Sequence, residues 1–156
     1  MTLNLVIKKV PGPWLALGVA AHFVARLETF GRFPAADLIR TLNGQISRGH
    51  YLFALDASAD PARVVGYFGW ALFDQAVGER FAATGMPPPD DLASNGDVLW
   101  ILTAAAQDRS AFFALVKATR ALYPHHRVMA VRHKPGGRRI VLDQSRARVR
   151  ARKPAS

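Results

Sequence analysis

Residues 64–71 read Val-Val-Gly-Tyr-Phe-Gly-Trp-Ala, an apolar run without a charged residue but with two glycines. Such a run, preceded by a turn-forming Asp/Ser/Pro segment, is typical of a central β-strand. A glycine inside a strand marks a position where a ligand or another part of the protein comes close to the backbone. The strand therefore predicts a sheet with either an open cleft or close helix packing beside Gly66 and Gly69.

The segments around this strand predict a mixture of helices and strands. Helical spacing of apolar residues and helix-stop signals predict helices over 14–30, 35–46, 74–84 and 111–123. Apolar or alternating runs predict strands over 3–10, 51–56, 62–73, 97–105, 127–133 and 138–143, the last two forming a hairpin. Asp108 or Ser110 is expected to cap the last helix, and the proline run at 86–91 is expected to be a surface loop. The predicted fold class is α+β: a mixed central sheet with helices packed on it and a C-terminal hairpin.

Length and composition limit the organisation of the chain. Its 156 residues, half of them hydrophobic, suit one domain, predicted over 1–143, followed by a basic, solvated and disordered tail over 144–156. The absence of cysteine excludes disulfides and thiolate chemistry. The longest apolar stretch, 14–25, is shorter than the roughly 20 residues that span a bilayer. The expected compartment is the cytoplasm.

Five segments match, in the same order, the motifs of one enzyme family. They are Leu17-Gly18, Arg32-Phe33-Pro34, the strand Val65–Ala71, Gly96-Asp97-x-x-Trp100, and Met129-Ala130-Val131-Arg132 followed by Lys134-Pro135. With these motifs the chain resembles the lysine acyltransferases that activate RTX toxins, whose fold is GNAT-like. The resemblance implies transfer of an acyl group from acyl carrier protein to a protein lysine, and it implies a homodimer.

The resemblance also locates the family's catalytic pair, a histidine and an aspartate. In this chain Phe30 or Gly31 stands at the histidine position, and Thr103 stands at the aspartate position. Phenylalanine and glycine cannot transfer a proton, and threonine is a poor base. His22, two helical turns before Phe30, is the histidine expected to take over, and Thr103 is expected to hydrogen-bond the substrate.

Further residues are assigned to the cleft and to the donor protein. Those expected to line the cleft are Phe30, Gly31, Gly66, Gly69, Trp70 and Trp100. A basic set is expected to bind the acidic acyl carrier protein: Arg120, Arg127, Arg132, Lys134 and Arg138. No glycine-rich loop opens a helix, so no site for the pyrophosphate of coenzyme A is expected, and acyl-acyl carrier protein is the expected donor. His125 and His126 lack metal-ligand spacing, so no metal is expected.

Two other functions are consistent with the residues. The chain could keep the fold without the chemistry, as a scaffold that binds acyl carrier protein, a hydrophobic ligand or a protein partner. Its net charge of +10 also fits a nucleic-acid-binding module. No helix-turn-helix, zinc-finger or RNP motif supports that last function, so nucleic acid is the least expected partner.

Overall fold

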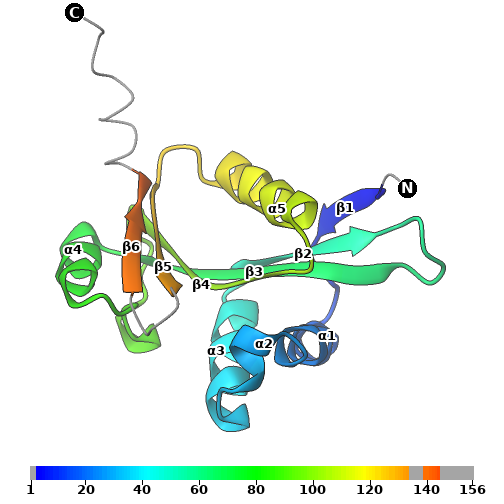
Figure 1. The fold of residues 1–156 in the computed structure, drawn as a ribbon. Helices are drawn as coiled ribbons and strands as arrows, with labels where there is room; N and C mark the ends of the chain where they lie inside the picture. Colours follow the sequence, from blue (N-terminus) through cyan, green and yellow to red (C-terminus); the bar gives the residue numbers. More distant parts are fainter. Residues whose placement is uncertain (1–2, 134–138, 145–156) are drawn as a thin grey trace, which may run out of the picture. The chain divides into compact units, whose positions relative to one another are not determined.

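A computed structural model describes residues 3–133 and 139–144 and has the α+β architecture predicted from the sequence (Figure 1). The elements in chain order are β1 (Leu5–Lys8), α1 (Pro13–Ala25), α2 (Glu28–Gly31), α3 (Ala35–Ser47), β2 (Tyr51–Asp56), β3 (Arg63–Phe73), α4 (Gln75–Thr84), a 3₁₀ turn (Asp90–Leu92), β4 (Val98–Ala106), α5 (Arg109–Leu122), β5 (Arg127–His133) and β6 (Arg139–Asp143).

The six strands form one hydrogen-bonded sheet in the order β1-β2-β3-β4-β5-β6. The sheet is mixed, because β1–β2, β2–β3 and β5–β6 pair antiparallel while β4 and β5 pair in parallel. The parallel pair is joined through α5, as a crossover connection requires. The prediction of a mixed sheet ending in an antiparallel β5–β6 pair is therefore confirmed.

The chain forms two compact units. The first contains the residues up to Trp70 and the segment Thr103–Pro124, and the second contains Ala71–Leu102 and the residues from His125. The boundary passes through β3 and β4, so each unit holds part of both strands.

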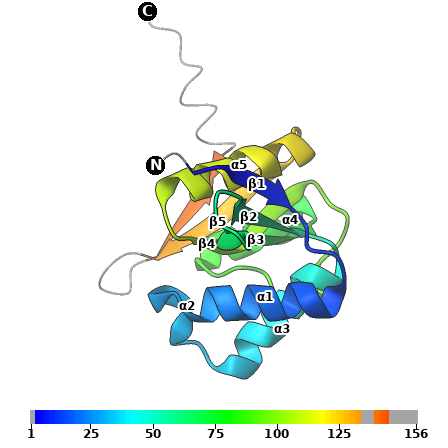
Figure 2. The same cartoon turned by 90° about the vertical axis from the view of Figure 1, so that its right-hand side faces the viewer.

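In the first unit, helices cover both faces of the strands. Helices α1, α2 and α3 lie on one face and α5 lies on the other (Figure 2). The core on the side of α1 and α3 is aromatic, with the rings of Phe53 and Tyr67 centred 5.1 Å apart. Ala16 and Ala20 are fully buried, so the small residues of α1 allow that helix to approach the core closely.

The second unit has its own core of Ala71, Phe73, Val98, Trp100 and Met129. Its strands are tied by an ion-pair cluster. The Arg127 guanidinium donates to both carboxylate oxygens of Asp143, at 3.1 and 2.6 Å, and to Glu79 of α4 at 3.2 Å. Hydrogen bonds to these partners raise the pKa of Arg127, and the bond to Asp143 makes the largest contribution. Arg127 therefore holds β5, β6 and α4 together.

Some predicted boundaries need correction. The single helix predicted over 14–30 is wrong, because Leu27 is extended (φ −81°, ψ 137°) and separates α1 from α2. Leu27 is half-buried against the core, and this contact outweighs the helical spacing that continues through it. The two candidate caps of α5 are resolved in favour of Asp108, whose Oδ1 accepts from the Ala111 N–H at 2.9 Å. The turn at 134–138 and the residues beyond 144 lie outside the described residues.

Candidate functional site

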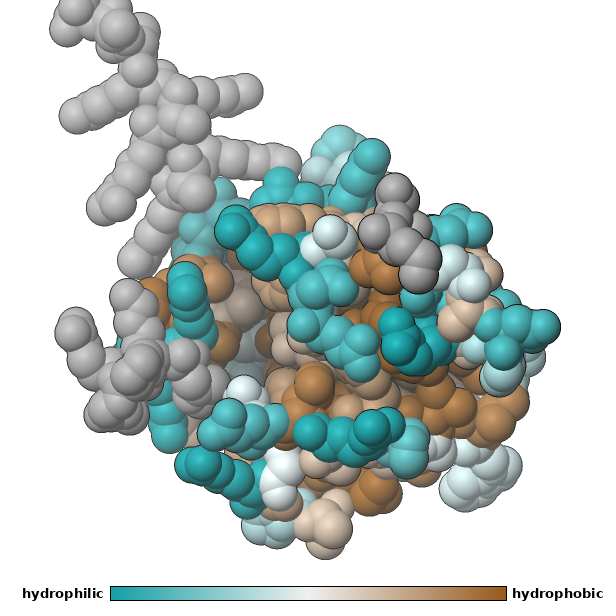
Figure 3. All heavy atoms as spheres, turned by 45° about the vertical axis from the view of Figure 1, so that its right-hand side comes forward, coloured by the Kyte–Doolittle hydropathy of each residue, from teal (hydrophilic) through white to brown (hydrophobic). Residues whose placement is uncertain are grey.

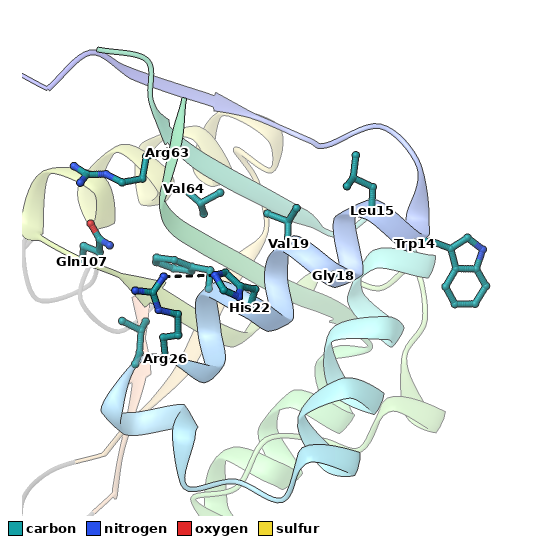
Figure 4. Close-up of a pocket in the computed structure, with 11 residues that line it drawn as sticks. Trp14, Leu15, Gly18, Val19, His22, Arg26, Arg63, Val64 and Gln107 are labelled. Atoms are coloured by element: carbon teal, nitrogen blue, oxygen red, sulfur yellow. Dashed lines mark hydrogen bonds between the residues drawn. The ribbon is translucent and has the colours of Figure 1, made fainter. Parts of the chain in front are cut away.

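An open groove of about 660 Å³ lies on the first unit beside α1 (Figure 4). Its residues come from α1, from the junction between α1 and α2, from the start of β3 and from the loop between β4 and α5. They are Trp14, Leu15, Gly18, Val19, His22, Phe23, Arg26, Leu27, Arg63, Val64 and Gln107. We call this feature the α1 groove. It contains His22, the predicted proton-transfer residue.

The apolar wall of the α1 groove follows from the sequence of α1, which is hydrophobic nearly all the way around. One side of the helix is buried in the core, yet Trp14 remains 82% exposed and Leu15 60% exposed. Gly18, about one helical turn after them, leaves open space, since no atom lies within 4 Å of the position that a Cβ would take there. Apolar surface reaches the solvent in the region of α1–α3 (Figure 3). Exposed apolar surface beside a groove is typical of a binding site.

The opposite end of the groove is polar and positively charged. His22, Arg26, Arg63 and Gln107 gather there, while Trp14 and Leu15 lie at the other end (Figure 4). Arg26 Nη1 lies 3.5 Å from His22 Nε2. Arginine can only donate, so a hydrogen bond at this contact requires the tautomer in which Nε2 is the accepting nitrogen. The groove thus joins an apolar wall to an imidazole and a guanidinium.

Thr103, the other predicted catalytic residue, does not line the α1 groove. It is 2% exposed, and its hydroxyl accepts from Gln45 Nε2 at 2.9 Å. The Gln45 Oε1 in turn accepts from the Tyr67 hydroxyl at 2.8 Å. Burial foremost raises the pKa of Tyr67, which therefore stays a neutral donor. These three side chains form a closed, buried network, which we call the Gln45 network.

The residues expected to line a cleft lie in packed surroundings. Phe30 is half-buried against the core, and its ring centre lies 6.1 Å from that of Phe33. A Cβ at Gly31 would lie 2.9 Å from the Ala25 carbonyl oxygen. Beside Gly66 lies Leu115 of α5, and beside Gly69 lies the side chain of Gln45.

The two tryptophans of the predicted cleft are both fully buried, Trp70 in the first unit and Trp100 in the core of the second. Neither is among the residues that line the α1 groove. Of the predicted site residues only His22 lines the α1 groove, together with Gly18 of the Leu17-Gly18 motif.

The predicted basic set divides into three groups. Arg120 on α5 and Arg132 on β5 are exposed. Arg127 is engaged in its ion-pair cluster, with its side chain only 19% exposed. Lys134 and Arg138 lie outside the described residues.

The N-terminus of α5 already holds a negative charge of the chain itself. The Asp108 carboxylate accepts from the Ala111 N–H there, and such a cap takes one of the backbone donors that a phosphate would need. Among residues 3–133 and 139–144, no group of three or more His, Cys, Asp or Glu side chains is arranged to hold a metal ion. No described helix is both long and apolar enough to cross a bilayer.

Several groove and network residues were missed from the sequence. Arg63 and Gln107 reach the groove from segments that are far apart along the chain, and no local pattern reveals that. Gln45 carried a usable signal, because it follows Leu42 by three residues on the apolar side of α3. A glutamine at such a position is expected to need buried hydrogen-bond partners.

Comparison with known proteins shows similarity only at the level of structure. No family model matches the chain, and no curated protein matches it. The GNAT-like decarboxylase GphF, solved in complex with isobutyryl-CoA, aligns with a TM-score of 0.60 at 17% identity, over 94% of this chain and 71% of that one. An N-acetyltransferase from Staphylococcus aureus Mu50 aligns with a TM-score of 0.45 at 11% identity, over 93% of this chain and 86% of that one. The likeness to GphF shows that this chain has a GNAT-like fold.

Proposed function

We propose that this chain is a protein-lysine acyltransferase of the toxin-activating type, which receives its acyl group from an acyl carrier protein. The observation that carries the proposal is the α1 groove, where an apolar wall leads to His22 and Arg26. An acyl chain suits the wall, and a thioester carbonyl suits the polar end. The GNAT-like fold adds support, since the similar decarboxylase was solved with an acyl thioester.

In the proposed reaction a lysine amine attacks the carbonyl carbon of the thioester. The C–N bond forms, the C–S bond breaks, and the nitrogen loses one proton to His22 Nε2. The imidazolium then returns this proton to the departing thiolate, so the products are an amide and a free thiol. Arg26, which donates to His22 in the free protein, turns to the carbonyl oxygen and stabilises the negative charge that develops there.

Two features support a carrier protein as the donor. Asp108 caps the N-terminus of α5 with a carboxylate, which disfavours a nucleotide pyrophosphate at that helix end. Arg120 and Arg132 are exposed cations that suit an acidic protein surface. The proposed acceptor is a lysine of an RTX-type protein.

The proposal is tested by incubating the protein with acylated acyl carrier protein and a lysine-containing acceptor, followed by mass spectrometry of the acceptor. We expect an acyl-lysine adduct, and we expect His22→Gln to reduce its rate by about a hundredfold or more. The matched control is His125→Gln, which changes an exposed histidine outside the groove. Acylation no faster than with heat-inactivated protein would contradict the proposal, as would equal rates for the two variants.

A second function, acyl binding without transfer, is favoured by one observation. Thr103, at the family's aspartate position, is engaged in the Gln45 network, and no carboxylate lines the α1 groove. Native mass spectrometry after mixing with a fatty acid separates the two functions. Binding that Leu15→Asp abolishes, without any acyl transfer, would identify a scaffold.

A further inference from the structure

Three aromatic rings meet on the face of β3 opposite the Gln45 network. His50, just before β2, accepts through its carbonyl from the Trp70 backbone N–H at 3.0 Å. Their rings are stacked, with centres 6.2 Å apart and planes inclined by 9°. The Tyr123 ring, at the end of α5, meets both edge-on, at 6.5 and 5.7 Å. Three separate segments of the first unit therefore build this cluster.

Two ring nitrogens of the cluster are buried without a hydrogen-bond partner among the described residues. They are His50 Nδ1 and Trp70 Nε1. Trp70 is fully buried, and an indole N–H can only donate a hydrogen bond. Buried donors in folded proteins are nearly always paired. Trp70 Nε1, and His50 Nδ1 in the tautomer that protonates it, can therefore each donate to an acceptor that is not among the described residues.

The charge around the cluster favours an anionic acceptor. Burial first, then the positive charges of Arg48 and Lys9, lower the pKa of His50. Lys9 Nζ lies 5.7 Å from the centre of the ring of Tyr51, the residue that follows His50 in the chain. Buried N–H donors with positive charge nearby are the surroundings that bind oxyanions in proteins.

We propose that His50 and Trp70, with Lys9 nearby, form a binding site for a small oxyanion, a carboxylate or a phosphate. Its oxygens accept from Trp70 Nε1 and from His50 Nδ1 in the tautomer that protonates this nitrogen. The Lys9 ammonium contributes positive charge. None of these three residues lines the α1 groove, so the site is separate from the proposed acyl site.

The test follows the indole N–H signals of the three tryptophans by ¹⁵N–¹H correlation NMR. Trp14→Phe and Trp100→Phe assign the Trp70 signal by elimination. Sodium acetate and sodium phosphate are each titrated against sodium chloride at matched ionic strength. We expect the Trp70 signal to shift saturably with acetate or phosphate while those of Trp14 and Trp100 stay in place. The anion that binds more tightly identifies the ligand class.

Two variants sharpen the test. His50→Phe keeps a ring in the stack but removes both nitrogens, and it should abolish the saturable shift. Lys9→Gln should weaken binding roughly three- to tenfold, while the matched control Lys8→Gln should leave it unchanged. A Trp70 signal that stays in place, or that moves equally with chloride, would overturn the proposal.

Discussion

The two faces of β3 pack against helices in different ways, although each uses a glycine to do so. On the side of α3, a Cβ at Gly69 would lie 1.7 Å from Gln45 Oε1. On the side of α5, a Cβ at Gly66 would lie 2.7 Å from Leu115 Cδ1 and 3.2 Å from the Ala54 Cβ. One glycine makes room for a polar side chain and the other for a methyl group.

The difference lies in how freely the neighbour can move. Gln45 is fully buried and is held at both ends of its amide, by Tyr67 and Thr103. Leu115 has no directional bond and can shift by a small rotation. An added methyl group at Gly69, on the α3 side, should therefore be poorly tolerated. The same addition at Gly66, on the α5 side, should be accommodated by movement of Leu115. Three predictions test this comparison, and a fourth concerns a turn away from both faces.

The largest effect is expected for Gly69→Ala. The new methyl group displaces the Gln45 amide, which breaks both of its hydrogen bonds, so the free energy of unfolding should fall by about 3 kcal/mol. Urea denaturation measures this change. In the Gln45→Ala background the same substitution should cost much less, and an equal cost in both backgrounds would show that the clash with Gln45 is not the cause.

Gln45→Leu should rank second. It leaves the hydroxyls of Tyr67 and Thr103 buried without their partner, and we expect a loss of about 2 kcal/mol in unfolding free energy. Adding Tyr67→Phe should restore part of the loss, because one stranded hydroxyl is then removed. A double variant less stable than Gln45→Leu would contradict the network.

Gly66→Ala should cost about 1 kcal/mol, clearly less than Gly69→Ala, because the Leu115 methyl can yield. Thermal unfolding compares the two alanine variants directly. Leu115→Val in the same chain as Gly66→Ala provides the matched control, since it shortens the neighbour and should reduce the penalty. If Gly66→Ala is as damaging as Gly69→Ala, the two faces are equally rigid.

The smallest effect is expected at the turn that joins β2 and β3, away from both faces. Hydrogen bonds from Ser58 foremost, opposed by burial, lower the pKa of Asp56 below its usual value of 3.8. A lowered pKa gives stability that is present above the unfolded pKa and is lost as pH falls through the folded one. Asp56→Asn should therefore flatten the stability profile between about pH 5 and pH 2. If the stability of Asp56→Asn falls with decreasing pH as steeply as that of the unchanged protein, Asp56 does not cause this pH dependence.

The sequence predicted the position of β3 and the importance of its glycines, because an apolar run with two glycines is a strong local pattern. It could not choose between an open cleft and close packing beside them. That choice depends on Gln45 and Leu115, which lie 24 and 49 residues away from Gly69 and Gly66 along the chain. Local patterns carry no information on such contacts.

The candidate site was predictable only in part. His22 was selected from the sequence and lies in the α1 groove. Arg63 and Gln107, which complete the polar end, are brought there by the sheet. The break at Leu27 also escaped prediction, since the helical spacing of apolar residues continues through a residue whose backbone is extended.

Because Trp14 is exposed, its fluorescence can report on ligand binding at the α1 groove. Trp70 and Trp100 are fully buried, so they should emit at short wavelength and be shielded from iodide, whereas Trp14, 82% exposed, should emit at long wavelength and be readily quenched. A ligand that covers the apolar end of the α1 groove would shield one fluorophore of three. Occupancy of the groove can therefore be followed by light emission alone, without a label and before any substrate is known.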